Sequence, residues 1–141
     1  MAALQALEGP QGGADPVLVV TPADQSIGDA AAFTAGLQRA VRAAAEGAVV
    51  VLGVTPDRPE TGYGYVRGAR AAQGEMRVER FVEKPDAATA QRYLDEGDYY
   101  WNSGMFVVRA STWLRALREF RADILSATEA SWAGRSVDAS F

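Results

Sequence analysis

The chain has 141 residues, of which 48% are hydrophobic and 23% charged, with a formal net charge of −4 and a pI near 4.8. This composition is typical of a globular chain large enough to bury a core, and it lacks the long basic run of a nucleic-acid-binding protein. Because cysteine and histidine are both absent, disulfides, thiolate catalysis, Cys/His zinc sites and histidine-based triads are excluded. Oxygen-ligated Mg²⁺ is the metal that suits the remaining side chains.

The sequence also has no apolar stretch of about 18 residues and no basic, apolar leader at its start. We therefore predict neither a membrane span nor a signal peptide. The absence of cysteine is compatible with the cytoplasm, which is the predicted location.

The first part of the chain predicts a short helix at residues 1–8 and then a strand–helix–strand unit. Val17–Val20 is a continuous branched apolar run, which predicts a strand buried on both faces, as in a parallel sheet. Asp29 is placed to cap the following helix, whose apolar residues recur at helical spacing until Gly47. Residues 49–52 form a second apolar run and predict a second buried strand.

The second part predicts strands at residues 63–67 and 76–82, joined around Gly74 as a hairpin or an irregular connection. A helix is predicted from Pro85-Asp86 to Gly97, and a further strand at residues 105–108. Two helices follow, one from about Ser111 and one from Arg121, and the tail from residue 134 has no clear pattern. Residues 1–141 are thus interpreted as part of one α/β domain.

Asp24 lies just beyond the first predicted strand, at the position where open α/β sheets bind ligands. A carboxylate there can ligate a Mg²⁺ ion that bridges phosphates. The alternative is an aspartate that hydrogen-bonds its own turn, and from position alone this alternative is favoured.

Three further segments carry polar groups near predicted strand ends. Gly62 and Tyr63 belong to a Gly-rich turn whose backbone N–H groups can approach a ligand closely, or to an ordinary turn before a strand. Glu83 can accept hydrogen bonds from sugar hydroxyls and Lys84 can neutralise a phosphate, or the two form a solvated charge pair. Asn102 both donates and accepts, which suits vicinal hydroxyls.

The aromatic residues 99–101 precede Asn102 directly. They can supply walls of a ligand pocket or belong to the core, and for aromatic residues before a strand the core is favoured. Each of these signals is weak alone, and their order along the chain is more specific.

That order consists of PAD at residues 22–24, ETGYGY at 60–65, FVEKP at 81–85 and YWNSGMF at 100–106. It closely resembles the mannose-1-phosphate guanylyltransferases, also called GDP-mannose pyrophosphorylases, and especially the type often fused to a phosphomannose isomerase domain. The resemblance covers nearly all of the chain. It implies a Rossmann-like nucleotidyltransferase fold with a mixed sheet.

The resemblance also implies a function and a set of site residues. Asp24 would hold Mg²⁺ and act with Lys84 in catalysis, Lys84 would bind the sugar phosphate, and Glu83, Asn102 and the turn at Gly62 and Tyr63 would contact the mannose. The reaction implied is mannose 1-phosphate plus GTP giving GDP-mannose, a precursor of polysaccharides, and pyrophosphate. The alternatives are a glucose-1-phosphate nucleotidyltransferase and a non-catalytic sugar-phosphate-binding module.

The chain departs from the family pattern in three places. The family's first strand and its Gly-rich loop should precede residue 1, and its second metal-binding aspartate should lie beyond residue 141. Gln25 stands where many members carry histidine. We therefore expect an incomplete domain with little or no activity alone, and an exposed apolar face that favours self-association into homo-oligomers.

Overall fold

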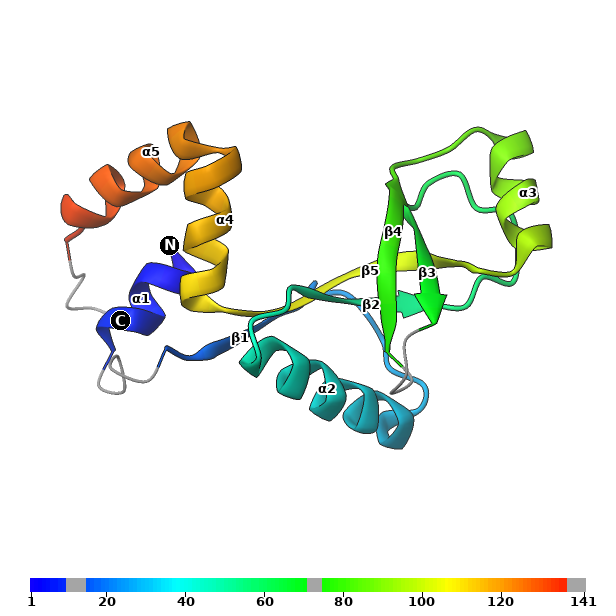
Figure 1. Cartoon of the computed structure of the whole chain (residues 1–141), viewed down its shortest axis with the longest axis horizontal. Coiled ribbons are helices and arrows are strands. Elements are labelled where there is room, and N and C mark those ends of the chain that lie inside the picture. The colour runs from blue at the N-terminus through cyan, green and yellow to red at the C-terminus, as the bar shows by residue number, and fades with distance from the viewer. Residues whose placement is uncertain (10–14, 71–74, 137–141) are drawn as a thin grey trace. The chain divides into compact units, whose positions relative to one another are not determined.

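The computed structural model describes residues 1–9, 15–70 and 75–136 (Figure 1). In these ranges the elements are α1 (Ala2–Glu8), β1 (Val17–Val20), α2 (Ala30–Ala45), β2 (Val50–Val54), β3 (Tyr65–Arg70), β4 (Met76–Val82), α3 (Ala87–Glu96), β5 (Tyr99–Arg109), α4 (Ala110–Phe120) and α5 (Ala122–Ala133). The order of helices and strands is that of the predicted α/β class. The predicted connection around Gly74 and the end of the tail lie outside the described residues.

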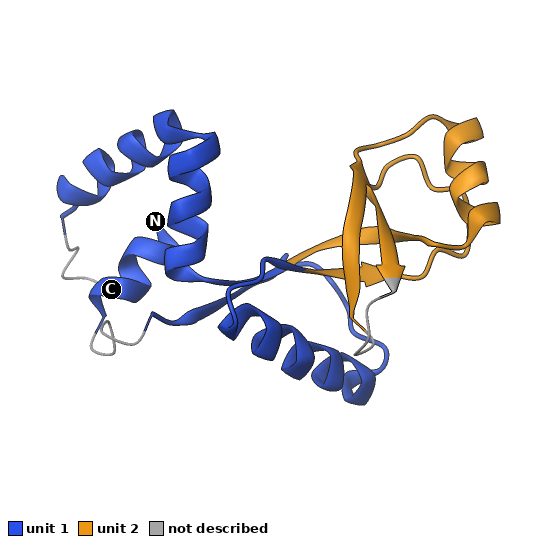
Figure 2. Ribbon diagram, in the orientation of Figure 1, with its two compact units in different colours: residues 1–50, 106–141 blue, residues 51–105 orange. Residues whose placement is uncertain are grey.

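The chain divides into two compact units (Figure 2). Unit 1 contains residues 1–50 and 106–141, and unit 2 contains residues 51–105. Strand β5 contributes its first seven residues, up to Met105, to unit 2 and the rest to unit 1. The strands are hydrogen-bonded in the order β1-β5-β3-β4, and β2 also pairs with β5.

In unit 1, β1 pairs antiparallel with the end of β5, so that Val17 lies opposite Arg109. Helix α2 packs against β1, and α4 packs against α1 and α5. Asp29 caps α2 as predicted, because its Oδ1 accepts the Ala32 N–H at 2.9 Å. Just after the helix, Gly47 has a φ of +101°, which glycine adopts without steric cost.

The prediction that the two apolar runs of this part form strands buried on both faces is wrong. Val19 and Val20 are 45% and 48% exposed, and β2 is half-buried at best. The pairing of β1 with β5 is antiparallel rather than parallel. A continuous apolar run indicates that both faces of a strand are suited to burial. It does not indicate the direction of the strand or which elements cover each face.

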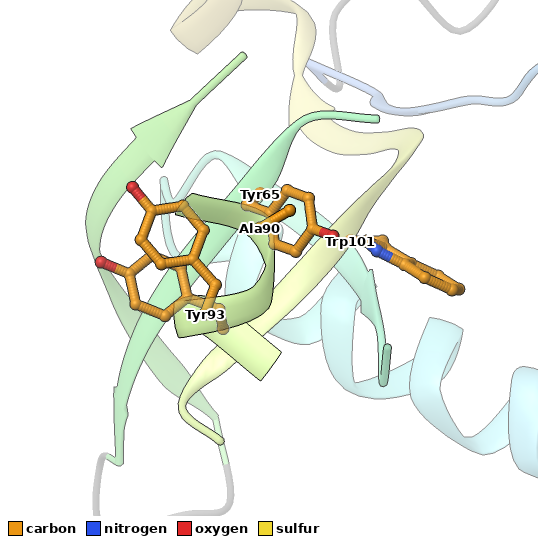
Figure 3. Close-up of a cluster of buried hydrophobic side chains, with 5 residues drawn as sticks. Tyr65, Ala90, Tyr93 and Trp101 are labelled. Carbon is orange, nitrogen blue, oxygen red and sulfur yellow. The ribbon is translucent and has the colours of Figure 1, made fainter. Parts of the chain in front are cut away.

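In unit 2, β3 is the middle strand of an antiparallel arrangement with β4 on one side and the first part of β5 on the other. A buried aromatic cluster fills the space between these strands and α3 (Figure 3). Its members are Tyr65, Ala90, Tyr93, Tyr99 and Trp101. Helix α3 begins at its predicted cap, Asp86, and ends at Gly97, whose φ is +74°.

Strand β5 is much longer than the predicted strand at residues 105–108, so Asn102 lies inside a strand rather than before one. Asn, Ser and Gly are weak strand formers, which is why the sequence pattern hides this part of β5. Hydrogen bonds of the Ser103 side chain compensate, because its Oγ donates to the Leu52 carbonyl at 2.6 Å and accepts the Met105 N–H at 3.1 Å. Among the helices that the structure describes, none is both long and apolar enough to span a membrane.

Candidate functional site

The three predicted sugar-phosphate segments lie at the same end of the unit 2 strands. Tyr65, the first residue of β3, lies opposite Val82 on β4 and opposite Trp101 on β5. Residues just before Tyr65 therefore lie beside those just after Val82 and just after Trp101. The structure thus brings the Gly62 turn (residues 60–64) together with Glu83, Lys84 and Asn102.

Backbone hydrogen bonds tie these segments to one another. The Tyr63 carbonyl accepts the Lys84 N–H at 3.2 Å, and the Gly64 carbonyl accepts the Asn102 N–H at 2.7 Å. Two consecutive carbonyls of the Gly62 turn thus hold the backbones of the two predicted ligand-binding segments. We call this arrangement of the Gly62 turn, Glu83, Lys84 and Asn102 the platform.

Glu83 and Lys84 are both exposed, and the Lys84 Nζ lies 3.7 Å from the Glu83 Oε1. This charge pair was the alternative interpretation from the sequence, and such exposed pairs contribute little to stability. The backbone gives a second observation, because Lys84 has a φ of +46°, in the left-handed region. That conformation costs a non-glycine residue about 1 kcal/mol or more, and such strain is concentrated at binding and catalytic sites.

The two glycines of the turn have different surroundings. A Cβ built on Gly64 would lie 2.8 Å from the Glu83 Oε2 and 3.1 Å from the Phe81 ring. Gly64 therefore provides the space into which the Glu83 carboxylate fits. The Gly62 N–H, one of the backbone groups that could approach a ligand, donates to the Glu60 Oε1 at 3.0 Å, which is compatible with the alternative of an ordinary turn.

Asn102 is half-buried in β5, and its Oδ1 accepts the N–H of Gly104 at 3.2 Å. Within the described ranges its side-chain nitrogen makes no hydrogen bond, so it keeps donors for hydroxyl oxygens.

The aromatic residues before Asn102 form core rather than pocket walls at two of three positions. Tyr99 and Trp101 are only 2% and 8% exposed, while Tyr100 is half-buried. The Tyr63 ring meets Trp101 edge-on, with ring centroids 5.3 Å apart. Tyr63 therefore joins the platform to the core while remaining exposed itself.

Asp24 belongs to unit 1, whereas the other predicted site residues belong to unit 2. Its carboxylate is exposed and, within the described part of the chain, makes no hydrogen bond or ion pair. The alternative in which Asp24 bonds its own turn is therefore not what the structure shows.

Asp24 is the candidate ligand for Mg²⁺. The described residues contain no group of three or more acidic side chains that could hold a metal ion. Mg²⁺ is usually bound through one or two carboxylates together with substrate phosphates and water rather than by a cage of protein ligands. A single exposed aspartate fits that role as one ligand among several.

Arg58 and Glu60 contact the platform or the core beneath it and are absent from the site residues predicted from the sequence. The Arg58 guanidinium lies 5.0 Å from the centre of the Trp101 ring, and its Nε is 3.5 Å from the Glu60 Oε2. Glu60 stands two residues before Gly62, and that spacing is a signal for a side chain bonding a turn N–H. No sequence signal marks Arg58, because its contact is with Trp101, which is distant along the chain.

Comparisons with known proteins show the family to which the chain belongs. Residues 2–141 match the nucleotidyl transferase family. The chain is 52% identical to the xanthan biosynthesis protein XanB of Xanthomonas campestris pv. campestris (strain B100) over 99% of its own length and 30% of that protein. It is 44% identical to mannose-1-phosphate guanylyltransferase of Escherichia coli K12 over 90% of its own length and 28% of that enzyme.

A solved structure confirms the predicted fold. The crystal structure of mannose-1-phosphate geranyltransferase from Thermus thermophilus superimposes with a TM-score of 0.82 at 39% sequence identity, over 96% of this chain and 40% of that one. The architecture is therefore the Rossmann-like α/β fold of nucleotidyltransferases. The chain spans about a third of the length of the two curated relatives. The family match spans residues 2–141, and the chain belongs to the nucleotidyl transferase family.

Proposed function

We propose that residues 1–141 are part of the catalytic domain of a cytoplasmic mannose-1-phosphate guanylyltransferase. The reaction is mannose 1-phosphate plus GTP giving GDP-mannose and pyrophosphate. In this proposal the platform binds the sugar phosphate, and the nucleotide is held largely by parts of the protein outside this chain. The names of the relatives, one a guanylyltransferase and one a polysaccharide biosynthesis protein, support this assignment.

The platform is the single observation that carries the proposal. It places a carboxylate, an ammonium and a carboxamide on segments joined by two backbone hydrogen bonds. A sugar phosphate presents hydroxyls and a dianionic group a few bonds apart, so it needs acceptors, donors and a cation at short range. Glu83 and Asn102 would bind the hydroxyls, Lys84 the phosphate, and the turn at Gly62 and Tyr63 would contact the sugar.

The chemistry requires no protein nucleophile. A phosphate oxygen of mannose 1-phosphate attacks the α-phosphorus of GTP in line, and pyrophosphate leaves. The chain's own part is to align the attacking oxygen and to offset charge with the Lys84 ammonium. We propose Asp24 as one ligand of Mg²⁺, an ion that would neutralise charge on the phosphates when bound.

Titration with mannose 1-phosphate tests the platform directly. A hydrogen bond to a charged group contributes about 1.5–3 kcal/mol, so we expect Lys84→Ala to raise the Kd by about 10- to 100-fold. Arg77→Ala is the matched control, because Arg77 is an exposed cation on β4, the strand that leads to Lys84, and lies outside the platform. Equal affinities for the chain and Lys84→Ala would contradict the proposal.

Parallel measurements separate the alternatives. Tighter binding of glucose 1-phosphate than of mannose 1-phosphate would favour a glucose-1-phosphate nucleotidyltransferase. GDP-mannose formation from GTP, mannose 1-phosphate and Mg²⁺, abolished in Lys84→Ala, would show that the 141 residues alone are catalytic. Binding in a longer, complete version that never turns over would favour the non-catalytic binding module.

We also propose that the chain self-associates through β1. The strand has one described pairing partner, β5, and its Val19 and Val20 side chains are about half exposed. Unpaired strand edges with apolar side chains are sites of association. In sedimentation experiments, the apparent mass of the chain should therefore rise with protein concentration. The apparent mass of Val19→Lys should be lower at the same concentration. A monomer at every concentration would contradict self-association.

A further inference from the structure

Glu60 makes three contacts, one within the Gly62 turn and two with the residues Arg58 and Tyr65 on either side of it. Its Oε1 accepts the Gly62 N–H at 3.0 Å, and its Oε2 lies 3.5 Å from the Arg58 Nε. Its backbone carbonyl accepts the Tyr65 hydroxyl at 2.9 Å. We call these three contacts the Glu60 clasp.

The two outer ends of the clasp contact the aromatic cluster, one through the buried Tyr65 and the other through the half-exposed Arg58. Tyr65 has no exposed surface, so the hydroxyl that holds the Glu60 carbonyl is itself fixed in the aromatic cluster. Arg58 lies over the ring of Trp101, which is only 8% exposed, and it is also paired with Asp57 at 3.0 Å. The Glu60 carboxylate is therefore held from outside the turn as well as from within it.

The Gly62 turn is hydrogen-bonded to the segments that carry Lys84 and Asn102, so its position affects theirs. The carbonyls of Tyr63 and Gly64 accept the N–H groups of Lys84 and Asn102 at 3.2 and 2.7 Å. A movement of the turn would thus move the backbones that carry the Lys84 ammonium and the Asn102 carboxamide. Misplacing a binding group by about 1 Å can lower activity by about 100-fold.

We propose that Glu60 is a positioning residue for the sugar-phosphate site, acting through the Gly62 turn on Lys84 and Asn102 without contacting the ligand. This inference rests on the proposed function for the identity of the ligand. It goes beyond the proposed function in one respect, because it removes the Gly62 N–H from the set of ligand contacts and assigns that N–H to Glu60. The carboxylate then matters as a hydrogen-bond acceptor rather than as a charge.

Two neutral variants of similar length test this distinction. Glu60→Gln keeps an acceptor oxygen for the Gly62 N–H, whereas Glu60→Met removes it, and both remove the same charge. Asp57→Asn is the matched control, because it removes a charge from the partner of Arg58 without touching the turn. The amide resonances of Gly62, Lys84 and Asn102 and the Kd for mannose 1-phosphate are measured in each isotope-labelled chain.

We expect Glu60→Met to shift all three amide resonances and to raise the Kd by about tenfold or more. In Glu60→Gln, the amide resonances and the Kd should stay close to those of the unmodified chain. Asp57→Asn should change neither quantity. The resonance of the Ala90 amide, in the core of unit 2, is the control for folding. It should be unchanged in each folded variant. If Glu60→Met fails to fold, Glu60→Gln must still give resonances near those of the unmodified chain.

Several outcomes would overturn the inference. Equal effects of Glu60→Met and Glu60→Gln would show that charge matters instead of the acceptor. Tighter binding in Glu60→Met would mean that the carboxylate competes with the ligand for the Gly62 N–H. If the unmodified chain does not bind mannose 1-phosphate, the proposed function fails, while the amide shifts of Lys84 and Asn102 still decide the role of Glu60.

Discussion

The end of β1 and the end of the unit 2 strands both carry polar residues just beyond a strand, but they are held in different ways. The segment after β1 leads from two half-exposed valines to the exposed Asp24. The segments of the platform are joined to one another by two backbone hydrogen bonds, and Tyr63 packs against Trp101 of the aromatic cluster. The difference indicates that unit 2 itself holds the residues of the proposed sugar-phosphate site, whereas Asp24, the proposed metal ligand, has no comparable support in the described residues.

The largest expected effect concerns the core beneath the platform. Trp101→Ala removes a side chain that is only 8% exposed and should lower the free energy of unfolding by about 3–5 kcal/mol. Val20→Ala, at an exposed position of β1, should change it by less than about 0.5 kcal/mol. Denaturant unfolding of the two variants checks this contrast, and comparable losses would show that β1 is supported as firmly as the platform.

A smaller effect is expected at Gly64. The new Cβ of Gly64→Ala would lie 2.8 Å from the Glu83 carboxylate and 3.1 Å from the Phe81 ring, which forces one of them to move. Overpacking of this kind costs about 1–3 kcal/mol, and weaker binding of mannose 1-phosphate should accompany it. Gly28→Ala, in unit 1, has open space around the new Cβ. Its stability and affinity should stay near those of the unmodified chain, and equal behaviour of the two variants would contradict the close approach.

Lys84 allows backbone strain to be separated from charge. Lys84→Ala and Lys84→Gly both remove the ammonium, but only glycine adopts a φ of +46° without steric cost. The glycine variant should therefore be more stable than the alanine variant by about 1 kcal/mol, while both bind mannose 1-phosphate equally poorly. Thermal unfolding and ligand titration measure the two quantities, and a less stable glycine variant would argue against strain at this residue.

The smallest expected effect is on the pH dependence of unit 1. Hydrogen bonds from Ser111, and then the charge of Arg109, lower the pKa of the Asp15 carboxyl below 3.8. The ionised form is therefore favoured in the folded state, so its contribution to stability is present above pH 3.8 and is lost as the pH falls through the lower folded pKa. Asp15→Asn should be less stable at neutral pH and should lose less stability on acidification.

Urea unfolding from acid to neutral pH measures this effect, with Asp57→Asn as a carboxylate change elsewhere. If Asp15→Asn and the unmodified chain had the same acid dependence, the hydrogen bonds of Asp15 to Ser111 would contribute nothing to folding. A positive result would show that the chain is anchored at Asp15, just before β1 begins, even though β1 is half-exposed where it ends.

Much of the local structure could be predicted from the sequence, because caps and stops are local signals. Asp29, Asp86 and Gly97 mark helix ends in the structure as they do in the sequence. The length of β5 and the burial of β1 could not be predicted in this way. Asn102 to Gly104 disfavour a strand and are held in one by Leu52, a partner 51 positions away from Ser103.

The candidate site shows the same difference between features that the sequence predicts and contacts that depend on the fold. Glu83, Lys84 and Asn102 could be selected because their chemistry and their order are visible in the sequence, and the structure brings them together. The occupation of the Gly62 N–H by Glu60, and the contact of Arg58 with Trp101, depend on how a turn folds over a neighbouring strand. Whether Asp24 acts with them stays a prediction.

Lys84 is the only lysine among the 141 residues, so the chain has a single side-chain amine, and this amine lies on the platform. Acetylation of lysine removes its positive charge. A single acetyl transfer would therefore neutralise the ammonium of the proposed phosphate site while every other cationic side chain, all of them arginine, stays unchanged.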